Sequence, residues 1–265
     1  MLKIMLFGVR DEEIPIIKAW STRNEVQVDY TELNLTPETI EMAKGYDGVT
    51  ISQVADLDVS LYPTLASYGI KQIAQRSAGF EMHDLTSATE NGLIISNVPS
   101  YSPESIAEYA VTAALNLVRK TDLIREKVAE QDFRWMPAIR ARVVKEMTVA
   151  IIGVGRIGSR VAYIYRGFGA NVVAYDIAPR EEFESLVAYQ ESAEAAISQA
   201  DIVTIHMPAT DVNYHQFSLD LFKQFKSGAI LVNTARGPIV HTEDLFQALE
   251  EGYIAGAALD VYEGE

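Results

Sequence analysis

The chain has 265 residues, with 22 Lys and Arg against 37 Asp and Glu, so its formal net charge is −15. Hydrophobic residues make up 48% and charged residues 22%, which is typical of globular proteins. The length predicts two domains, because a domain usually has about 100–200 residues. The acidic balance argues against a nucleic-acid partner, since phosphate binding needs clustered Lys and Arg.

The sequence also argues against a membrane partner and a metal site. The most apolar helical stretch, Tyr109 to Val118, is far shorter than the roughly 20 residues that a membrane span needs. The first eight residues are too short for a secretory signal and are predicted to form a strand. There is no cysteine, and the four histidines are scattered, so thiolate and zinc sites are not expected. We therefore expect a cytoplasmic enzyme or binding protein.

Short β-rich runs alternate with amphipathic segments in the first hundred residues. Strands are predicted at residues 3–7, 26–30, 48–51, 71–74 and 93–96, and helices at 14–20 and 37–43. Strands separated by helices indicate βαβ units and a parallel sheet. We therefore predict a small, doubly wound, flavodoxin-like domain over residues 1–100.

The segment from Ser96 to Pro103 interrupts this pattern and is the predicted domain boundary. Ser102 is predicted to cap the next helix, with Pro103 in its first turn. Apolar residues three and four positions apart continue that helix to Val118. Residues 132–144 are predicted to form a loop in which Trp135 is a packing anchor.

Strands resume at residues 148–152, 171–175, 202–206, 229–233 and 254–259, with helices between them. A full dinucleotide-binding sheet has six strands in the order 3-2-1-4-5-6. We therefore predict a second doubly wound domain over residues 101–265, of Rossmann type and without its last strand.

A glycine-rich turn at residues 153–158, Gly-Val-Gly-Arg-Ile-Gly, follows the apolar strand 148–152 directly. In a dinucleotide-binding loop, Gly153 permits the tight turn, Gly155 lets the backbone approach a pyrophosphate, and Gly158 lets helix and strand pack closely. The N-terminus of the next helix offers N–H groups and a positive dipole to phosphates. Glycine triplets occur in many turns, but the flanking strand and helix favour a dinucleotide site.

Asp176 ends the second strand of this half. A carboxylate there accepts hydrogen bonds from the adenosine ribose hydroxyls and repels a 2′-phosphate. The sequence therefore predicts NAD rather than NADP as the cofactor. Arg180 could weaken this preference, although it is predicted to be a solvated side chain.

Three further segments, residues 97–103, 233–238 and 258–265, make the chain resemble the D-2-hydroxyacid dehydrogenase family. The resemblance covers the whole chain, and residues 8–12 and 133–137 are most similar to the bacterial D-lactate dehydrogenase branch. The family reversibly reduces 2-oxo acids to D-2-hydroxy acids with NADH and is usually homodimeric. The resemblance therefore implies this activity, a small 2-oxo or 2-hydroxy acid as the substrate, and a homodimer.

The resemblance assigns catalytic roles to Arg236 and Glu265. Arg236 matches the substrate-binding arginine, whose guanidinium can hold a carboxylate and stabilise negative charge on the carbonyl oxygen. Glu265 matches the carboxylate that pairs with an acid/base histidine. Spacing alone does not separate Glu265 from Glu263, and the family motif assigns the role to Glu265.

The resemblance also makes the first domain the substrate domain. The turn Ser77-Ala78-Gly79 matches the family's carboxylate-binding backbone, or is a simple strand-to-helix turn. Tyr101 matches a residue near the substrate, or packs at the hinge. The loop and the resemblance together assign cofactor binding to Gly153, Gly155, Arg156, Ile157, Gly158, Asp176, His206, Met207, Pro208, Asn213, Thr234, Ala235, Arg236 and Asp260.

The family's acid/base histidine has no counterpart in this sequence. His83, His215 and His241 are predicted to be surface or packing residues. We therefore expect a C-terminally truncated chain whose first domain lacks its return helix and exposes an apolar sheet edge. Such a chain is expected to bind NAD with impaired turnover, since a positioned acid contributes about 10²–10⁴ in rate.

Pyruvate is the favoured substrate, with two alternatives. Ser52 replaces a tyrosine that many D-lactate members carry, and the wider pocket would admit branched 2-oxo acids, as in a D-2-hydroxyisocaproate-type dehydrogenase. The missing acid leaves a non-catalytic NAD-sensing protein as the other alternative.

Overall fold

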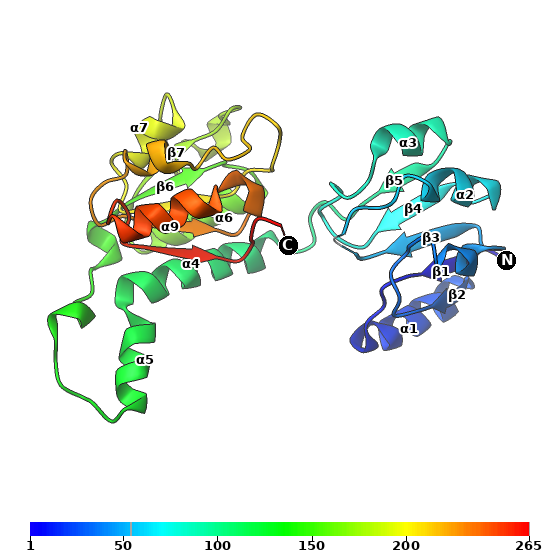
Figure 1. The fold of residues 1–265 in the computed structure, drawn as a ribbon, viewed down its shortest axis with the longest axis horizontal. Helices are drawn as coiled ribbons and strands as arrows, with labels where there is room; N and C mark the ends of the chain where they lie inside the picture. Colours follow the sequence, from blue (N-terminus) through cyan, green and yellow to red (C-terminus); the bar gives the residue numbers. More distant parts are fainter. Residues whose placement is uncertain (54, 265) are drawn as a thin grey trace. The chain divides into compact units, whose positions relative to one another are not determined.

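The computed structural model describes residues 1–53 and 55–264. They form two compact units, Met1–Tyr101 and Ser102–Glu265 (Figure 1). Each unit is built on one parallel sheet, so the predicted α/β class with two doubly wound domains is confirmed.

The first unit alternates strands and helices, as the sequence predicts. Its elements are β1 (Lys3–Leu6), α1 (Ile14–Asn24), β2 (Gln27–Tyr30), β3 (Gly48–Ile51), α2 (Leu61–Ser67), β4 (Gln72–Gln75), α3 (Leu85–Glu90) and β5 (Ile94–Ser96). The strand order β2-β1-β3-β4-β5 is the flavodoxin-like order, so the ends of β1 and β3 lie at the centre of the sheet.

One predicted helix of this unit is wrong. Residues 37–43 contain only a short 3₁₀ turn, Ile40–Ala43. The hydroxyl of Thr39 donates to the carbonyl of Asn34 at 2.6 Å and accepts from the amide of Thr36 at 2.9 Å. Such side-chain bonds to the backbone compete with a regular helix.

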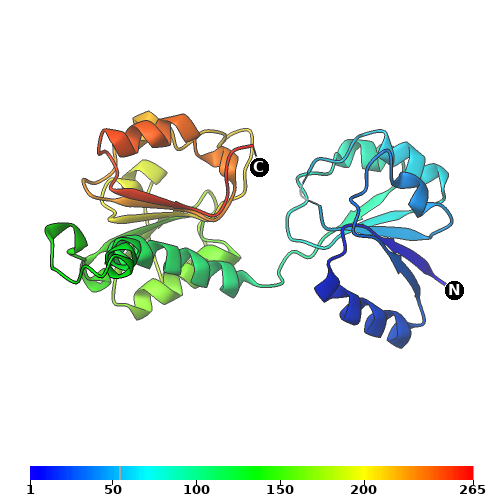
Figure 2. The ribbon, with the colours of Figure 1, turned by 60° about the horizontal axis from the view of Figure 1, so that its bottom comes forward.

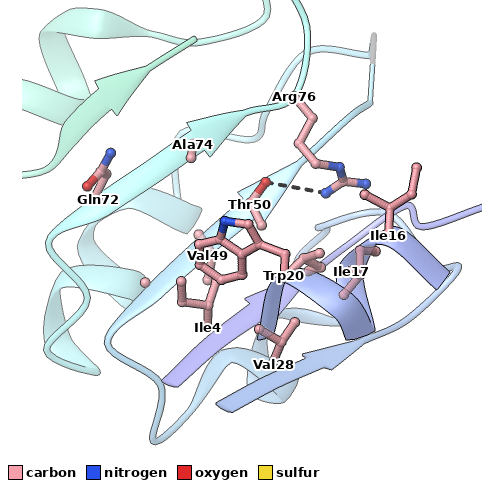
Figure 3. Close-up of a pocket in the computed structure, with 12 residues that line it drawn as sticks. Ile4, Ile16, Ile17, Trp20, Val28, Val49, Thr50, Gln72, Ala74 and Arg76 are labelled. Atoms are coloured by element: carbon pink, nitrogen blue, oxygen red, sulfur yellow. Dashed lines mark hydrogen bonds between the residues drawn. The ribbon is translucent and has the colours of Figure 1, made fainter. Parts of the chain in front are cut away.

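Helices cover the two faces of the first sheet unequally. Leu61, Tyr62 and Leu65 of α2 and Ala88 of α3 pack with the buried core on one face. On the other face a cavity of about 390 Å³ lies between α1 and the sheet, lined by Trp20 and mainly aliphatic side chains (Figure 3). Ile94 pairs with Gln72, which lines the cavity, and is 63% exposed. Apolar surface is therefore open on this face of the sheet.

The second unit begins with two helices and continues as a βαβ series. Its elements are α4 (Pro103–Arg119), α5 (Thr121–Ala129), β6 (Thr148–Ile152), α6 (Arg156–Gly167), β7 (Asn171–Tyr175), β8 (Ala188–Tyr189), α7 (Ala193–Ile197), β9 (Ile202–Ile205), α8 (Leu219–Phe222), β10 (Ile230–Asn233), α9 (Thr242–Glu250) and β11 (Gly256–Leu259).

This sheet has six strands among the described residues, in the order β11-β10-β9-β6-β7-β8. That order is the complete 3-2-1-4-5-6 arrangement read from the opposite edge. The prediction of a Rossmann sheet without its last strand is therefore wrong. The strand missed in the sequence is β8, which has two residues and pairs only with β7 at the sheet edge. Two residues are too few to show the periodicity of a strand.

Helices cover both faces of the second sheet (Figure 2). Side chains of α4 and α6 pack with β6 and β7 on one face, and α7, α8 and α9 pack on the other. No helix of the described residues is long and apolar enough to cross a membrane.

Two predictions about the start of this unit need correction. Ser102 is the N-cap of α4, but its side chain makes no capping hydrogen bond. Trp135 is 71% exposed and Phe133 is 78% exposed, so Trp135 is not a packing anchor within the described chain. The segment between α5 and β6 therefore presents large apolar side chains on the surface.

Candidate cofactor and catalytic site

Two glycines of the turn after β6 lie where a side chain would collide with the backbone. Gly153 has a φ of +97°, and a Cβ there would lie 2.7 Å from the carbonyl oxygen of His206. A Cβ on Gly158 would lie 2.0 Å from the carbonyl oxygen of Gly153. The start of α6 is therefore held against the turn more closely than any other residue would permit.

The middle glycine has a different environment. A Cβ on Gly155 would meet nothing within 4 Å. Gly155 is the N-cap of the 12-residue α6, so the N–H groups of Arg156 and Ile157 lie in the first turn, where the helix dipole is positive. Ile157 packs against the core beneath and anchors this turn. The open space at Gly155 and the positive end of the helix dipole together fit a phosphate group.

Asp176 follows β7 and is tied to the glycine-rich turn. Its Oδ2 accepts a hydrogen bond from the amide of Val154 at 2.6 Å, and its Oδ1 accepts from the amide of Ala178 at 2.8 Å. These bonds orient the carboxylate beside the turn and leave oxygen lone pairs for ribose hydroxyls. Arg180 pairs with Glu182 at 3.6 Å.

The segment after β9 lies against the same turn. The amide of His206 donates to the carbonyl of Ile152 at 2.8 Å, and its ring Nε2 lies 2.8 Å from the hydroxyl of Thr204. Burial lowers the pKa of His206 to about 3, so its ring is neutral at neutral pH. After Met207, the side chain of Asn213 bonds the carbonyl of Pro208 at 2.8 Å and stabilises the loop.

A closed turn carries Arg236 after β10. The fully buried Asn233 donates to the carbonyl of Arg236 at 3.0 Å and accepts from the amide of Ala235 at 3.0 Å. The buried hydroxyl of Thr234 has no hydrogen-bond partner among the described residues. An unsatisfied buried hydroxyl beside the turn is available to a bound ligand.

The segment after β11 packs directly on this turn. The amide of Asp260 donates to the carbonyl of Asn233 at 3.0 Å. A Cβ on Gly237 would lie 2.0 Å from the carbonyl oxygen of Tyr262 and 2.6 Å from the nitrogen of Glu263. The turn that carries Arg236 and the segment that carries Asp260 are therefore in close contact. Glu265 lies outside the described residues.

A polar cluster beside this contact was not predicted from the sequence. The Nε2 of His215 pairs with Oε1 of Glu263, and the hydroxyl of Thr242 donates to Oε2 of Glu263 at 3.0 Å. His241 packs edge-on against His215, with ring centroids 4.5 Å apart, and pairs with Asp244 at 2.9 Å. His215 and His241 are thus packing residues, as predicted, but they also bind carboxylates.

The turn at residues 77–79 belongs to the first unit. The carbonyl of Ser77 accepts from the amide of Val98 at 3.0 Å, and the carbonyl of Ala78 accepts from the side chain of Asn97 at 2.7 Å. The backbone N–H groups of Ala78 and Gly79 donate to no other described residue. The turn therefore offers donors for an anion. Tyr101 ends this unit and is 65% exposed.

Arg76, just before this turn, connects the ends of three strands of the first sheet. Its guanidinium donates to the carbonyls of Phe7 and Gly8 at 3.0 Å each, to the hydroxyls of Thr50 at 3.3 Å and Ser52 at 3.2 Å, and to Glu13 at 3.3 Å. Burial lowers the pKa of Arg76, and the carboxylate of Glu13 opposes this shift. The sequence signal for this role is an arginine directly after a buried strand.

Comparison with protein families identifies the second unit. Residues 111–265 match the family described as D-isomer specific 2-hydroxyacid dehydrogenase, NAD binding domain. The chain belongs to this family. The resemblance predicted from the motifs is therefore confirmed, as is NAD as the cofactor.

Individual 2-hydroxyacid dehydrogenases are similar along the whole chain. A D-lactate dehydrogenase of Streptococcus agalactiae is 52% identical over 264 residues, 100% of this chain and 80% of that protein. The NAD-complexed D-isomer specific 2-hydroxyacid dehydrogenase of Lactobacillus delbrueckii ssp. bulgaricus is 36% identical with a TM-score of 0.84, covering 99% of this chain and 80% of that chain. A D-2-hydroxyisocaproate dehydrogenase is 32% identical with a TM-score of 0.90, covering 99% of this chain and 79% of that chain.

Membership of the 2-hydroxyacid dehydrogenase family makes the chain an NAD-dependent oxidoreductase that acts on a CH–OH group. The second unit is its NAD-binding domain. The alternative of a non-catalytic NAD-sensing protein is therefore set aside.

The different surroundings of Gly155 and Gly158 predict different effects of added methyl groups. Gly155→Ala should leave the melting temperature almost unchanged, because a Cβ meets no atom, but should weaken NADH binding by filling the phosphate space. Gly158→Ala should lower the melting temperature, because the turn must move. Thermal unfolding and NADH fluorescence titration of both variants measure this. Equal loss of stability in the two variants would contradict the assignment.

The depressed pKa of His206 predicts a loss of stability in acid. The unfolded chain binds a proton at His206 below about pH 6.5, whereas the native ring resists protonation until much lower pH. Above about pH 6.5, therefore, His206 does not lower the free energy of unfolding. As the pH falls from there toward the folded pKa of about 3, protonation of the unfolded chain lowers it progressively. Urea unfolding at about pH 7.5 and about pH 5 should show a smaller decline in His206→Gln than in the wild type. An equal decline in both proteins would contradict this account.

Proposed function

We propose that the protein reduces pyruvate to D-lactate with NADH, reversibly, and that Arg236 binds the substrate. The observation that carries this proposal is the turn that holds Arg236. It lies at the carboxyl end of β10, closed by Asn233 and packed against the segment after β11. The glycine-rich turn follows β6 at the same edge of the sheet, where ligands of open α/β sheets bind.

In this proposal the chain's own residues bind and orient both reactants. NADH, when bound, would supply the hydride for the C2 carbonyl, and the proton for the carbonyl oxygen would come from the acid/base histidine of the family, which has no counterpart in these 265 residues. The guanidinium of Arg236 holds the substrate carboxylate and carbonyl and stabilises the negative charge that develops on oxygen. The free N–H groups of Ala78 and Gly79 would bind the carboxylate, and Tyr101 would lie near the substrate. Glu265 keeps the catalytic carboxylate role that the family motif assigns to it.

Different residues would bind the adenosine, pyrophosphate and nicotinamide parts of NADH. Asp176 would bind the ribose hydroxyls, and the N-terminus of α6 would bind the pyrophosphate. Asp260 would contact the nicotinamide side. The buried hydroxyl of Thr234, which has no hydrogen-bond partner among the described residues, supports a ligand contact at the turn that carries Arg236. The segments 206–208 and 234–235 would line the cofactor.

The environment of Ser52 supports pyruvate over branched 2-oxo acids. Its hydroxyl donates to the carbonyl of Gly8 at 2.8 Å and accepts from Arg76 at 3.2 Å. A cavity of about 440 Å³ beside it is also lined by Arg10, Glu32 and Asn34. Branched aliphatic groups gain little from such polar surroundings, because burying polar groups without partners costs free energy.

Substitution of Arg236 tests this proposal. Arg236→Lys in the full-length protein should lower kcat/KM for pyruvate by about 100-fold, because a lysine keeps the charge but cannot form bidentate hydrogen bonds to the substrate. NADH affinity should remain. Arg180→Lys, an exposed arginine paired with Glu182, is the matched control. Full activity of Arg236→Lys, or a higher kcat/KM for 2-oxoisocaproate than for pyruvate, would contradict the proposal.

We also propose that the protein is a cytoplasmic homodimer whose interface includes α4, α5 and the segment after them. Phe133, Trp135 and Val143 are 78%, 71% and 53% exposed in this segment. Three large apolar side chains exposed within one segment favour a protein interface there.

The dimer proposal predicts that a charge in this segment dissociates the protein. Trp135→Glu should shift the sedimentation-equilibrium mass from dimer toward monomer, because a carboxylate at the interface must be desolvated. Phe246→Glu, on the 63% exposed phenylalanine of α9, should leave the mass unchanged. A wild-type monomer would refute the proposal.

A further inference from the structure

Glu263 is a carboxylate to which the mechanism above gives no part, yet the structure binds it on both oxygens. Oε1 pairs with Nε2 of His215. Oε2 accepts from the hydroxyl of Thr242 at 3.0 Å and from its amide at 3.3 Å. The side chain is 28% exposed, so these contacts are partly shielded from water.

The partner His215 is itself fixed on several sides. Its ring stacks on Tyr214 with centroids 3.8 Å apart and contacts His241 edge-on. Its backbone has a φ of +52°, and its amide donates to the carbonyl of Pro238 at 2.9 Å. A histidine held in the left-handed region needs such support from its surroundings. Glu263 therefore binds to a rigid group.

These contacts join three loops at the carboxyl edge of the second sheet. His215 lies on the loop after β9, Thr242 begins α9 after the Arg236 turn, and Glu263 lies on the segment after β11. The same segment also contacts the Arg236 turn, where Gly237 packs against the backbone of Tyr262 and Glu263 with no room for a Cβ. Movement of Glu263 would therefore move the Arg236 turn or open this contact.

We propose that Glu263 is a positioning residue of the dehydrogenase, which holds the Asp260 segment against the Arg236 turn through His215 and Thr242. This inference rests on the proposed role of Arg236 in substrate binding. Glu263 itself does not contact the reacting atoms. Its bound oxygens also separate it from Glu265, the carboxylate for which it could be mistaken on spacing alone.

The charges around the pair agree with this role. Hydrogen bonding to His215 and Thr242 lowers the pKa of Glu263, so the carboxylate stays charged at neutral pH. Asp244, which accepts from the amide of Leu219 at 2.7 Å, pairs with Nδ1 of His241 at 2.9 Å. Each of the two histidine rings thus has its own carboxylate partner.

Substitution of Glu263 in the full-length protein tests the proposal. Glu263→Ala should lower kcat/KM for pyruvate by about 10–100-fold through a higher KM and a lower kcat, because an error of about 1 Å in a positioned group can cost about 100-fold. ADP-ribose binding, which probes only the Asp176 side, should be unchanged. Glu263→Gln should restore most of the activity, since its amide can accept from Thr242 and donate to His215.

Two further variants make the result decisive. Glu251→Ala is the matched control: Glu251 is an exposed carboxylate that follows α9, accepts from the side chain of Gln247 at 2.7 Å and lies outside the cluster of His215, Thr242 and Glu263, so both kinetic constants should stay unchanged. His215→Asn removes the pair from the other side, and the double variant with Glu263→Ala should lose no more than either single variant, as expected for groups acting as a unit.

The outcomes distinguish this inference from the proposed function. Unchanged KM and kcat in Glu263→Ala, or equal loss of pyruvate turnover and ADP-ribose binding, would overturn the positioning role. Additive losses in the double variant would also overturn it. A wild-type protein that binds ADP-ribose but reduces no pyruvate would instead refute the proposed function.

Discussion

The contact of Gly158 with the carbonyl of Gly153 controls the geometry of the cofactor side. Because neither residue carries a Cβ, the first turn of α6 approaches the end of β6 closely enough for its N-terminus to lie against the glycine-rich turn. The position of this N-terminus, and of the Val154 amide that binds Asp176, depends on that approach. A methyl group at Gly158 would therefore disturb both the phosphate and the ribose sides.

The parallel sheet brings candidate cofactor and substrate residues from distant parts of the sequence to one edge. The turns after β6, β9, β10 and β11 all follow carboxyl ends of strands in one register. The chain stabilises this edge with direct contacts between loops, such as Gly237 on Tyr262 and Glu263 on His215. Because these loops are already ordered by such contacts, ligand binding has a smaller entropic cost of loop ordering.

The sequence predicted most of the fold because the central strands are apolar and bounded by helices. It missed β8, whose two residues have no recognisable period, and it misjudged Trp135, since composition does not reveal which surface a large ring faces. The glycine turn and Asp176 were found because their spacing is local. The pair of His215 and Glu263 was not found, because residues 48 positions apart meet only through the strand order.

The bond between Asp176 and the Val154 amide has a consequence for anyone who wishes to redesign the enzyme for a phosphorylated cofactor. Replacing Asp176 by a small neutral residue would remove the repulsive charge, but it would also leave the Val154 amide without its acceptor at 2.6 Å. The glycine-rich turn would then be less rigid, although a phosphorylated cofactor, which is larger and more charged, depends on an ordered turn. A successful exchange must therefore supply a new oxygen for that amide, so that selectivity and loop order are engineered together.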